Sequence, residues 1–108
     1  MVQASDSREV SNMQFLITAY DGSDDNAQER RAAARPAHID GAQVLKDSGR
    51  LLIGGAILDE SGQMIGSSLI VEFDDREALD EWLNNDPYVT GNVWQDISVL
   101  PFRVAVKS

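Results

Sequence analysis

The order of six patterned segments leaves this chain few architectures. Four segments have the apolar pattern of strands, and two carry apolar residues at the three-to-four-residue spacing of helices. The predicted strands are residues 14–20, 50–58, 64–73 and 93–106, and the predicted helices are residues 26–47 and 74–85. A Gly-containing loop at residues 59–63 has the length that joins the strands of a hairpin. The order is therefore strand, helix, strand, strand, helix, strand.

Two prolines lie inside these segments. Pro36 falls in the first predicted helix, where proline removes a backbone hydrogen bond and clashes with the preceding turn. We therefore expect either a kink or two consecutive helices, with Pro36 near the start of the second. Pro101 interrupts the last predicted strand, which indicates an edge position or a bend.

This order of elements is typical of ferredoxin-like α+β domains. We expect a four-stranded antiparallel sheet with both helices on one face. The chain has 108 residues, of which 43% are hydrophobic, so it can bury one core. Residues 1–12 are polar and Ser-rich and are predicted to be a flexible leader, which leaves residues 13–108 as the domain.

The sheet face opposite the helices is also predicted to be apolar. Either Leu51, Ile53 and Ile57 or the alternating set of Leu52, Ala56 and Leu58 must look away from the helices. An open apolar face of this size needs cover, and a second copy of the chain is the simplest cover. The sequence therefore predicts a homodimer.

Charge and cysteine content exclude several classes of function. The formal net charge of -9 disfavours nucleic acid and anionic membranes as partners, although it also simply keeps a small protein soluble. No cysteine is present, which excludes disulfides and thiolate chemistry. No apolar run is long enough to span a membrane and no signal peptide is apparent, so we expect a cytoplasmic protein.

His38 is the only histidine and hence the only possible imidazole base. On a helix it shares a face with apolar residues and with Arg31, and the small residues Gly41 and Ala42 beside it leave room for a ligand. The alternative is an ordinary half-buried histidine whose nitrogens are hydrogen-bonded. One histidine with scattered carboxylates predicts no transition-metal site.

Asp86 and a few other polar residues could complete a site. A carboxylate against an imidazole fixes the tautomer and stabilises the imidazolium, whereas an Asp before Pro87 could equally serve only the turn. Arg31 and Arg35 could bind a planar anion, or they could pair with Glu29 or Asp40. The neighbours Ser67 and Ser68 point to opposite faces of their strand, so one of them could line a pocket.

Four short motifs give the chain a resemblance to the YCII-related family over residues 13–107. The motifs are Arg31…Arg35-Pro36-Ala37-His38, Gly49-Arg50-Leu51-Leu52-Ile53-Gly54-Gly55, Gly66-Ser67, and Asp86-Pro87-Tyr88 followed by Val99…Pro101-Phe102. One departure is Gly54-Gly55-Ala56, where the family often reads Gly-Gly-Pro. The leader, residues 1–12, has no counterpart in the pattern.

The resemblance implies a ferredoxin-like domain that pairs as a dimeric α/β barrel. It also implies an active site built on a histidine and an aspartate, whose positions match His38 and Asp86. Arg31, Arg35, Ser67 and Tyr88 become candidates for binding a small-molecule substrate.

Three functions remain open at this point. The first is an enzyme of lyase or dehydrohalogenase type in which His38 abstracts a proton, Asp86 orients it, and no cofactor is required. The second is a non-catalytic module that binds a small ligand or a partner through the same pocket. The third is a structural assembly domain.

Overall fold

The computed structural model describes residues 13–108, and the leader predicted at residues 1–12 lies outside them. The strands are β1 (Met13–Asp21), β2 (Leu51–Leu58), β3 (Met64–Phe73) and β4 (Trp94–Phe102), and the helices are α2 (Ala27–Asp47), α3 (Arg76–Asn85) and α4 (Pro87–Thr90). All four predicted strands and both predicted helices are present. The short helix α4 was not predicted, because four residues are too few to show a helical period.

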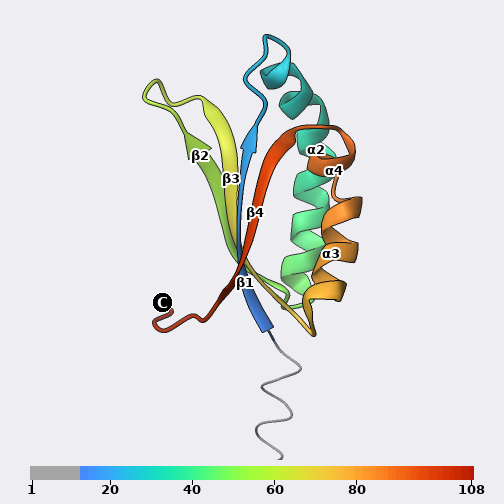
Figure 1. Cartoon of the computed structure of the whole chain (residues 1–108), viewed down its shortest axis with the longest axis vertical. Coiled ribbons are helices and arrows are strands. Elements are labelled where there is room, and N and C mark those ends of the chain that lie inside the picture. The colour runs from blue at the N-terminus through green and yellow to red at the C-terminus, as the bar shows by residue number, and fades with distance from the viewer. Residues whose placement is uncertain (1–12) are drawn as a thin grey trace, which may run out of the picture.

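The four strands form one antiparallel sheet in the order β2-β3-β1-β4. All three helices lie on one side of this sheet, and the other side is open (Figure 1). The predicted fold class, a ferredoxin-like α+β domain with a four-stranded antiparallel sheet and helices on one face, is therefore confirmed. Within the described residues, no helix is long and apolar enough to cross a membrane.

The core lies between the sheet and the helices. On β1 the alternation of a strand sends Phe15, Ile17 and Ala19 toward the helices, where all three are buried. In the antiparallel register, Phe15 lies opposite Val71 and Ile17 opposite Leu69, so both strands present apolar side chains to the same core. One polar residue joins this row, because Ser67 lies opposite Ala19 and is also buried.

The helix α2 runs without a break through Pro36. Of the two alternatives predicted at Pro36, the one with two consecutive helices was therefore wrong. Proline has no N–H to donate to the carbonyl of Ala32. Pro36 and Ala32 are both exposed, so water can donate a hydrogen bond to that carbonyl instead. Meanwhile Arg31, His38 and Leu45 on the opposite side are buried, so packing holds both halves of the helix in line. The helix ends before Gly49, whose φ of 81° is the left-handed conformation that glycine favours.

The strand β4 is shorter than predicted, ending at Phe102 instead of residue 106. Its neighbour β1 begins at Met13, and Gln14 of β1 lies opposite Phe102. Among the described residues, β1 therefore has almost nothing left to pair with the residues after Phe102. The prediction that Pro101 occupies an edge position is confirmed, since β4 is the last strand of the sheet.

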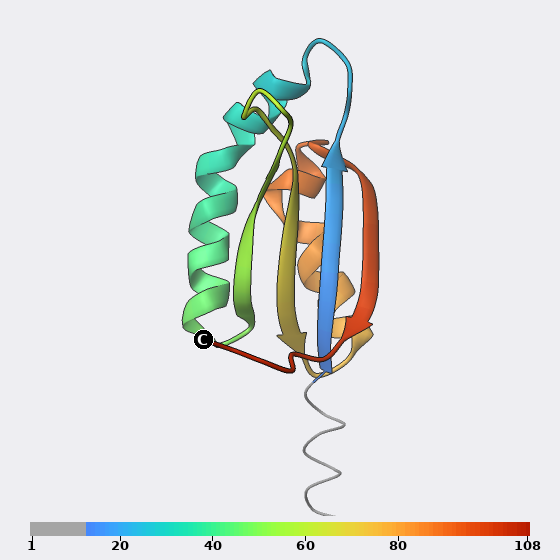
Figure 2. The ribbon, with the colours of Figure 1, turned by 90° about the vertical axis from the view of Figure 1, so that its left-hand side faces the viewer.

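The open face of the sheet is crossed by a row of apolar residues. Ile53, Ile70, Leu16 and Leu100 lie opposite one another on β2, β3, β1 and β4 in turn. Figure 2 views the molecule from this side, with the sheet in front of α3. Of the two expected sets, Ile53 and Ile57 belong to this face, whereas Leu51 turns to the helices because the register shifts between Leu51 and Ile53.

Candidate active site

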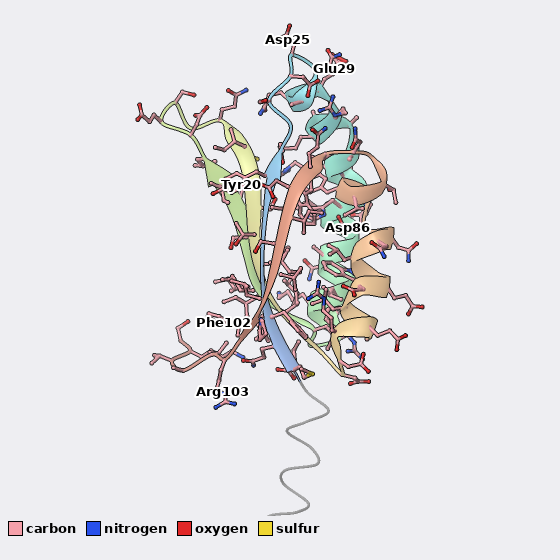
Figure 3. The ribbon with its side chains drawn as sticks, viewed as in Figure 1. Tyr20, Asp25, Glu29, Asp86, Phe102 and Arg103 are labelled. Carbon is pink, nitrogen blue, oxygen red and sulfur yellow. The ribbon has the colours of Figure 1, made fainter. Side chains whose placement is uncertain are left out.

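His38 and Asp86 meet on the helix side of the sheet. His38 projects from the middle of α2, and Asp86 occupies the junction between α3 and α4. Figure 3 labels Asp86 at this junction, whereas Tyr20 and Phe102 lie on the side of the open face. The distance from His38 Nδ1 to Asp86 Oδ2 is 2.8 Å, and the two side chains are only 8% and 2% exposed. The structure thus brings together two residues that are 48 positions apart.

Asp86 serves the turn and the imidazole with the same oxygen. Its Oδ2 accepts a hydrogen bond from the backbone N–H of Tyr88 at 2.9 Å, which caps the start of α4. The two interpretations of Asp86 are therefore compatible. A carboxylate can only accept, so Nδ1 of a neutral His38 carries the hydrogen and Nε2 has the free lone pair.

The second imidazole nitrogen of His38 is not fully buried. Within residues 13–108, Nε2 of His38 has no hydrogen-bond partner. Over the same residues, the one buried side-chain nitrogen or oxygen without a partner is Nε of Arg31. Nε2 therefore keeps some contact with solvent, and His38 is among the residues that line the pocket described below.

Two aromatic rings hold the imidazole. The ring of Tyr88 stacks on His38 with centroids 3.8 Å apart and planes 10° apart, and Trp94 meets His38 edge-on at 5.5 Å. Burial raises the pKa of the Tyr88 hydroxyl above its ordinary value, although the nearby charges of Arg31 and Arg35 oppose this shift. The phenol therefore stays neutral across the physiological range.

Arg31 is held in a buried network beside this aromatic cluster. Its Nη1 lies 2.9 Å from both carboxylate oxygens of Asp21, and the two side chains are 6% and 2% exposed. Its Nη2 donates to Ser67 Oγ at 3.1 Å, and Trp94 Nε1 donates to the same oxygen at 3.1 Å. The guanidinium carbon also lies 4.9 Å from the centre of the Tyr88 ring. Arg31 therefore pairs with Asp21, not with Glu29 or Asp40 as the surface alternative supposed.

A pocket of about 230 Å³ opens between α2 and the strands β2 and β3. Its polar lining comes from Arg31, Arg35, His38, Ser67 and Tyr88. The remaining walls are apolar or small, and they are formed by Ile39, Ala42, Leu51, Gly54, Gly55, Ala56, Met64 and Leu69. Pockets for drug-sized ligands usually measure about 300–1,000 Å³, so this one suits a smaller molecule of about one ring.

A second hollow, of about 350 Å³, lies between α2 and α3. Val44, Trp82 and Pro87 make it largely apolar, and Asp86 is the one ionisable residue in its lining. The smaller pocket, which combines an imidazole with two guanidinium groups, therefore has the richer chemistry.

Five of the six candidate residues line the smaller pocket, and the sixth, Asp86, lies behind His38. Of the two serines, Ser67 is the one that faces the pocket, because its side of β3 looks toward the helices. Sequence reasoning missed Asp21 and Trp94. Asp21 continues the buried alternation of Phe15, Ile17 and Ala19, and this parity is the signal that could have found it.

Metal binding has little support in this part of the molecule. Within residues 13–108, no cluster of three or more His, Cys, Asp or Glu side chains could hold a metal ion. The polar groups of the pocket lining are the imidazole of His38, the guanidinium groups of Arg31 and Arg35, and the hydroxyls of Ser67 and Tyr88.

Comparison with known proteins gives the family. The pattern of the YCII-related domain matches residues 13–103. The chain is 38% identical over 97 residues to Protein YciI of Escherichia coli O6:H1. The alignment covers 84% of this chain and 97% of that protein.

Solved structures share the fold. A 5-chloro-2-hydroxyhydroquinone dehydrochlorinase from Burkholderia phenoliruptrix, in complex with 2,5-dihydroxybenzoquinone, superimposes with a TM-score of 0.75 at 24% identity, covering 86% of this chain and 96% of that one. A dimeric protein of unknown function from Bacteroides fragilis, with a ferredoxin-like fold, gives 0.52 at 13% identity, with coverages of 85% and 96%. With the sequence matches beside this shared fold, the chain belongs to the YCII-related family.

Proposed function

We propose that the chain is an enzyme that removes a proton from a small hydroxylated ring and expels a leaving group from it. The observation that supports this most directly is the His38–Asp86 pair, buried on one side and in contact with a pocket on the other. Asp86 holds the Nδ1 hydrogen, so the lone pair of Nε2 is the base. The Asp86 carboxylate then stabilises the imidazolium that forms.

The proposed step is an elimination that needs no external oxidant or reductant. The ring first takes up its keto form, in which the hydroxyl next to the halogen has become a carbonyl and its proton has moved to the carbon that bears the halogen. Nε2 of His38 then takes the proton of the hydroxyl para to that carbonyl, and the electron pair of the broken O–H bond forms a second carbonyl. The neighbouring C=C pair shifts to form a new double bond to the halogen-bearing carbon, and the halide leaves with the pair of its carbon–halogen bond. His38 then releases its proton to water, so that the substrate has lost one hydrogen and one halide.

The lining of the pocket supports a ring with anionic character as the substrate. Arg35 lines the pocket, and among the described residues it has no carboxylate partner, in contrast to Arg31. A free guanidinium in a chain of net charge -9 would attract and bind a phenolate or carboxylate. The fold relative that acts on a chlorinated hydroxyhydroquinone suggests the same class of compound.

The test is chloride release from 5-chloro-2-hydroxyhydroquinone under nitrogen. We expect the wild-type chain to release chloride and His38→Gln to be slower by about 10²-fold or more, since general-base catalysis typically contributes 10²–10⁴-fold. Gln can still donate an N–H to Asp86, so the variant removes the base and keeps a polar partner. Chloride release at equal rates in both proteins would contradict the proposal.

The same experiment tests the alternative of a binding module. A module would bind the compound in both proteins, as measured by calorimetry, and neither protein would release chloride. In that case His38 would act only as a hydrogen-bonding group.

We further propose that a second copy of the chain covers the open sheet face. Ile53 and Leu100 lie at the two ends of the apolar row on this face and are 65% and 55% exposed. Tyr20 and Phe102 add apolar surface on the same side. The dimeric protein with the related fold supports a pairing of this kind.

Replacing Ile53 by Glu is expected to convert the dimer into a monomer. The substitution places a charge within the proposed interface, where it would lose its hydration. Val44 is a matched control, because it is 69% exposed but lies on α2, away from the sheet. Light scattering after size exclusion should give a dimer mass for wild type and Val44→Glu, and a monomer mass for Ile53→Glu. A monomeric wild type would refute the pairing.

A further inference from the structure

The hydroxyl of Ser67 has an unusual hydrogen-bond environment. A serine hydroxyl has two acceptor lone pairs and one donor hydrogen. Arg31 Nη2 and Trp94 Nε1 both donate to Ser67 Oγ, each at 3.1 Å. A guanidinium and an indole N–H can donate but never accept, so neither bond can be reversed. Both lone pairs are therefore occupied, and the hydroxyl hydrogen must be donated to a third group.

That third group is not supplied by the protein that surrounds Ser67. No acceptor for this hydrogen lies within residues 13–108, although other serines of the chain do donate, as Ser48 does to the carbonyl of Leu45. Ser67 is 3% exposed, and the surface that it retains lines the pocket beside His38. The unused hydrogen is therefore available to a molecule in the pocket.

We propose that Ser67 determines substrate specificity. Its hydroxyl is an obligatory hydrogen-bond donor and binds substrates that present a carbonyl or phenolate oxygen to it. This inference builds on the proposed function and adds the substrate class. A ligand whose ring oxygen can accept a hydrogen bond from Ser67 is bound. A ligand with an N–H at the same place meets only donors, so the Ser67 hydroxyl is left without an acceptor.

The network behind Ser67 strengthens this donor. The positive guanidinium of Arg31 withdraws electron density from the hydroxyl oxygen, which makes its hydrogen a better donor. Asp21 holds Arg31 in place through two 2.9 Å contacts, and Trp94 fixes the second lone pair. Asp21, Arg31 and Trp94 are thus positioning residues that act through Ser67. The negative charge that spreads over the ring when His38 removes a proton would then rest partly on the oxygen that Ser67 binds.

Binding of 2,5-dihydroxybenzoquinone, followed by its absorbance, tests the role of Ser67. Ser67→Ala is expected to raise the Kd by about tenfold to a hundredfold, the usual effect of losing a hydrogen bond to a charged group. Ser67→Thr keeps the hydroxyl and should stay within about threefold of wild type. An unchanged Kd in Ser67→Ala would overturn the proposal, as would a wild-type chain that does not bind the quinone.

A second variant covers the case in which Ser67→Ala fails to fold, because alanine would leave two buried N–H groups without an acceptor. Trp94→Phe frees one lone pair of Ser67, which could then accept from an amino group. The wild type should prefer 2,5-dihydroxybenzoquinone to 2,5-diaminobenzoquinone, and Trp94→Phe should reduce this preference by about fivefold or more. An equal preference in both proteins would refute the donor role.

The outcome for Ser67 is separable from the outcome for the enzyme. Weaker quinone binding by Ser67→Ala, with no chloride released by any variant, would support the donor and refute the elimination. Chloride release that depends on His38, with quinone binding indifferent to Ser67, would do the reverse.

Discussion

Replacing Arg31 by Met is expected to lower the free energy of unfolding by about 3–5 kcal/mol, the usual cost of breaking a buried ion pair from one side. Methionine has a similar length and fits an apolar wall. It leaves Asp21, whose side chain is only 2% exposed, with a buried carboxylate and no cation to pair with. It also removes one donor from Ser67. Small domains have a total stability of about 5–15 kcal/mol, so urea unfolding should show a large shift of the midpoint.

The neighbouring residue provides the control. Arg30 makes a slightly shorter ion pair, with Nη2 2.7 Å from Asp24 Oδ1, but those side chains are 25% and 50% exposed. The pairing lowers the pKa of Asp24, yet water already screens both charges. Arg30→Met should therefore lower the free energy of unfolding much less than Arg31→Met does. A similar loss of unfolding free energy in both variants would mean that burial of the Arg31–Asp21 pair does not increase its contribution to stability.

A double variant sharpens the interpretation. Replacing Arg31 by Met and Asp21 by Leu removes both charges and should recover much of the stability lost in Arg31→Met, since no charge is then left unpaired. The same protein should bind the quinone poorly, because Ser67 would no longer be polarised by a cation.

The sequence predicted most of the fold because the fold depends on local patterns. The alternation of Phe15, Ile17 and Ala19 predicted both the strand and its buried side, and the turn at Gly49 predicted the end of the long helix. Pro36 left a break in the helix open as an alternative, since a single-residue rule gives no weight to Arg31, His38 and Leu45, which pack both halves of α2 against the rest of the domain.

The candidate site could be predicted only in part. His38 stood out as the one imidazole, but its meeting with Asp86 depends on how α2 packs against the junction of α3 and α4, which no spacing along the chain reveals. That pairing was expected from the family resemblance.

The second half of the site was missed for a related reason. Asp21 belongs to an acidic stretch with Asp24 and Asp25, and only the alternation of the preceding strand distinguishes the buried carboxylate among them. The strand was predicted to end at Tyr20, one residue too early to place Asp21 on the buried side. Trp94 lies opposite Asp21 on β4, so both residues come into the site through long-range strand pairing.

Replacing Asp86 by Asn is expected to lower kcat for the proposed elimination by about 10²–10⁴-fold while KM changes little. Asparagine has nearly the same shape, and its amide oxygen can still accept from Tyr88 N–H and from His38 Nδ1. What the variant loses is the negative charge beside the imidazolium that forms when His38 takes a proton. A loss in kcat without a loss in binding is therefore the expected kinetic result.

Asp75 is the matched control for this prediction. It caps α3 as Asp86 caps α4, with its side chain accepting from Ala78 N–H at 2.8 Å, but it has no histidine partner. Since Asn caps a helix about as well as Asp, both variants should keep the free energy of unfolding within about 1 kcal/mol of wild type. The two carboxylates thus differ chiefly in that only Asp86 contacts an imidazole. If Asp75→Asn and Asp86→Asn reduce kcat equally, Asp86 serves the turn alone and His38 works without a carboxylate.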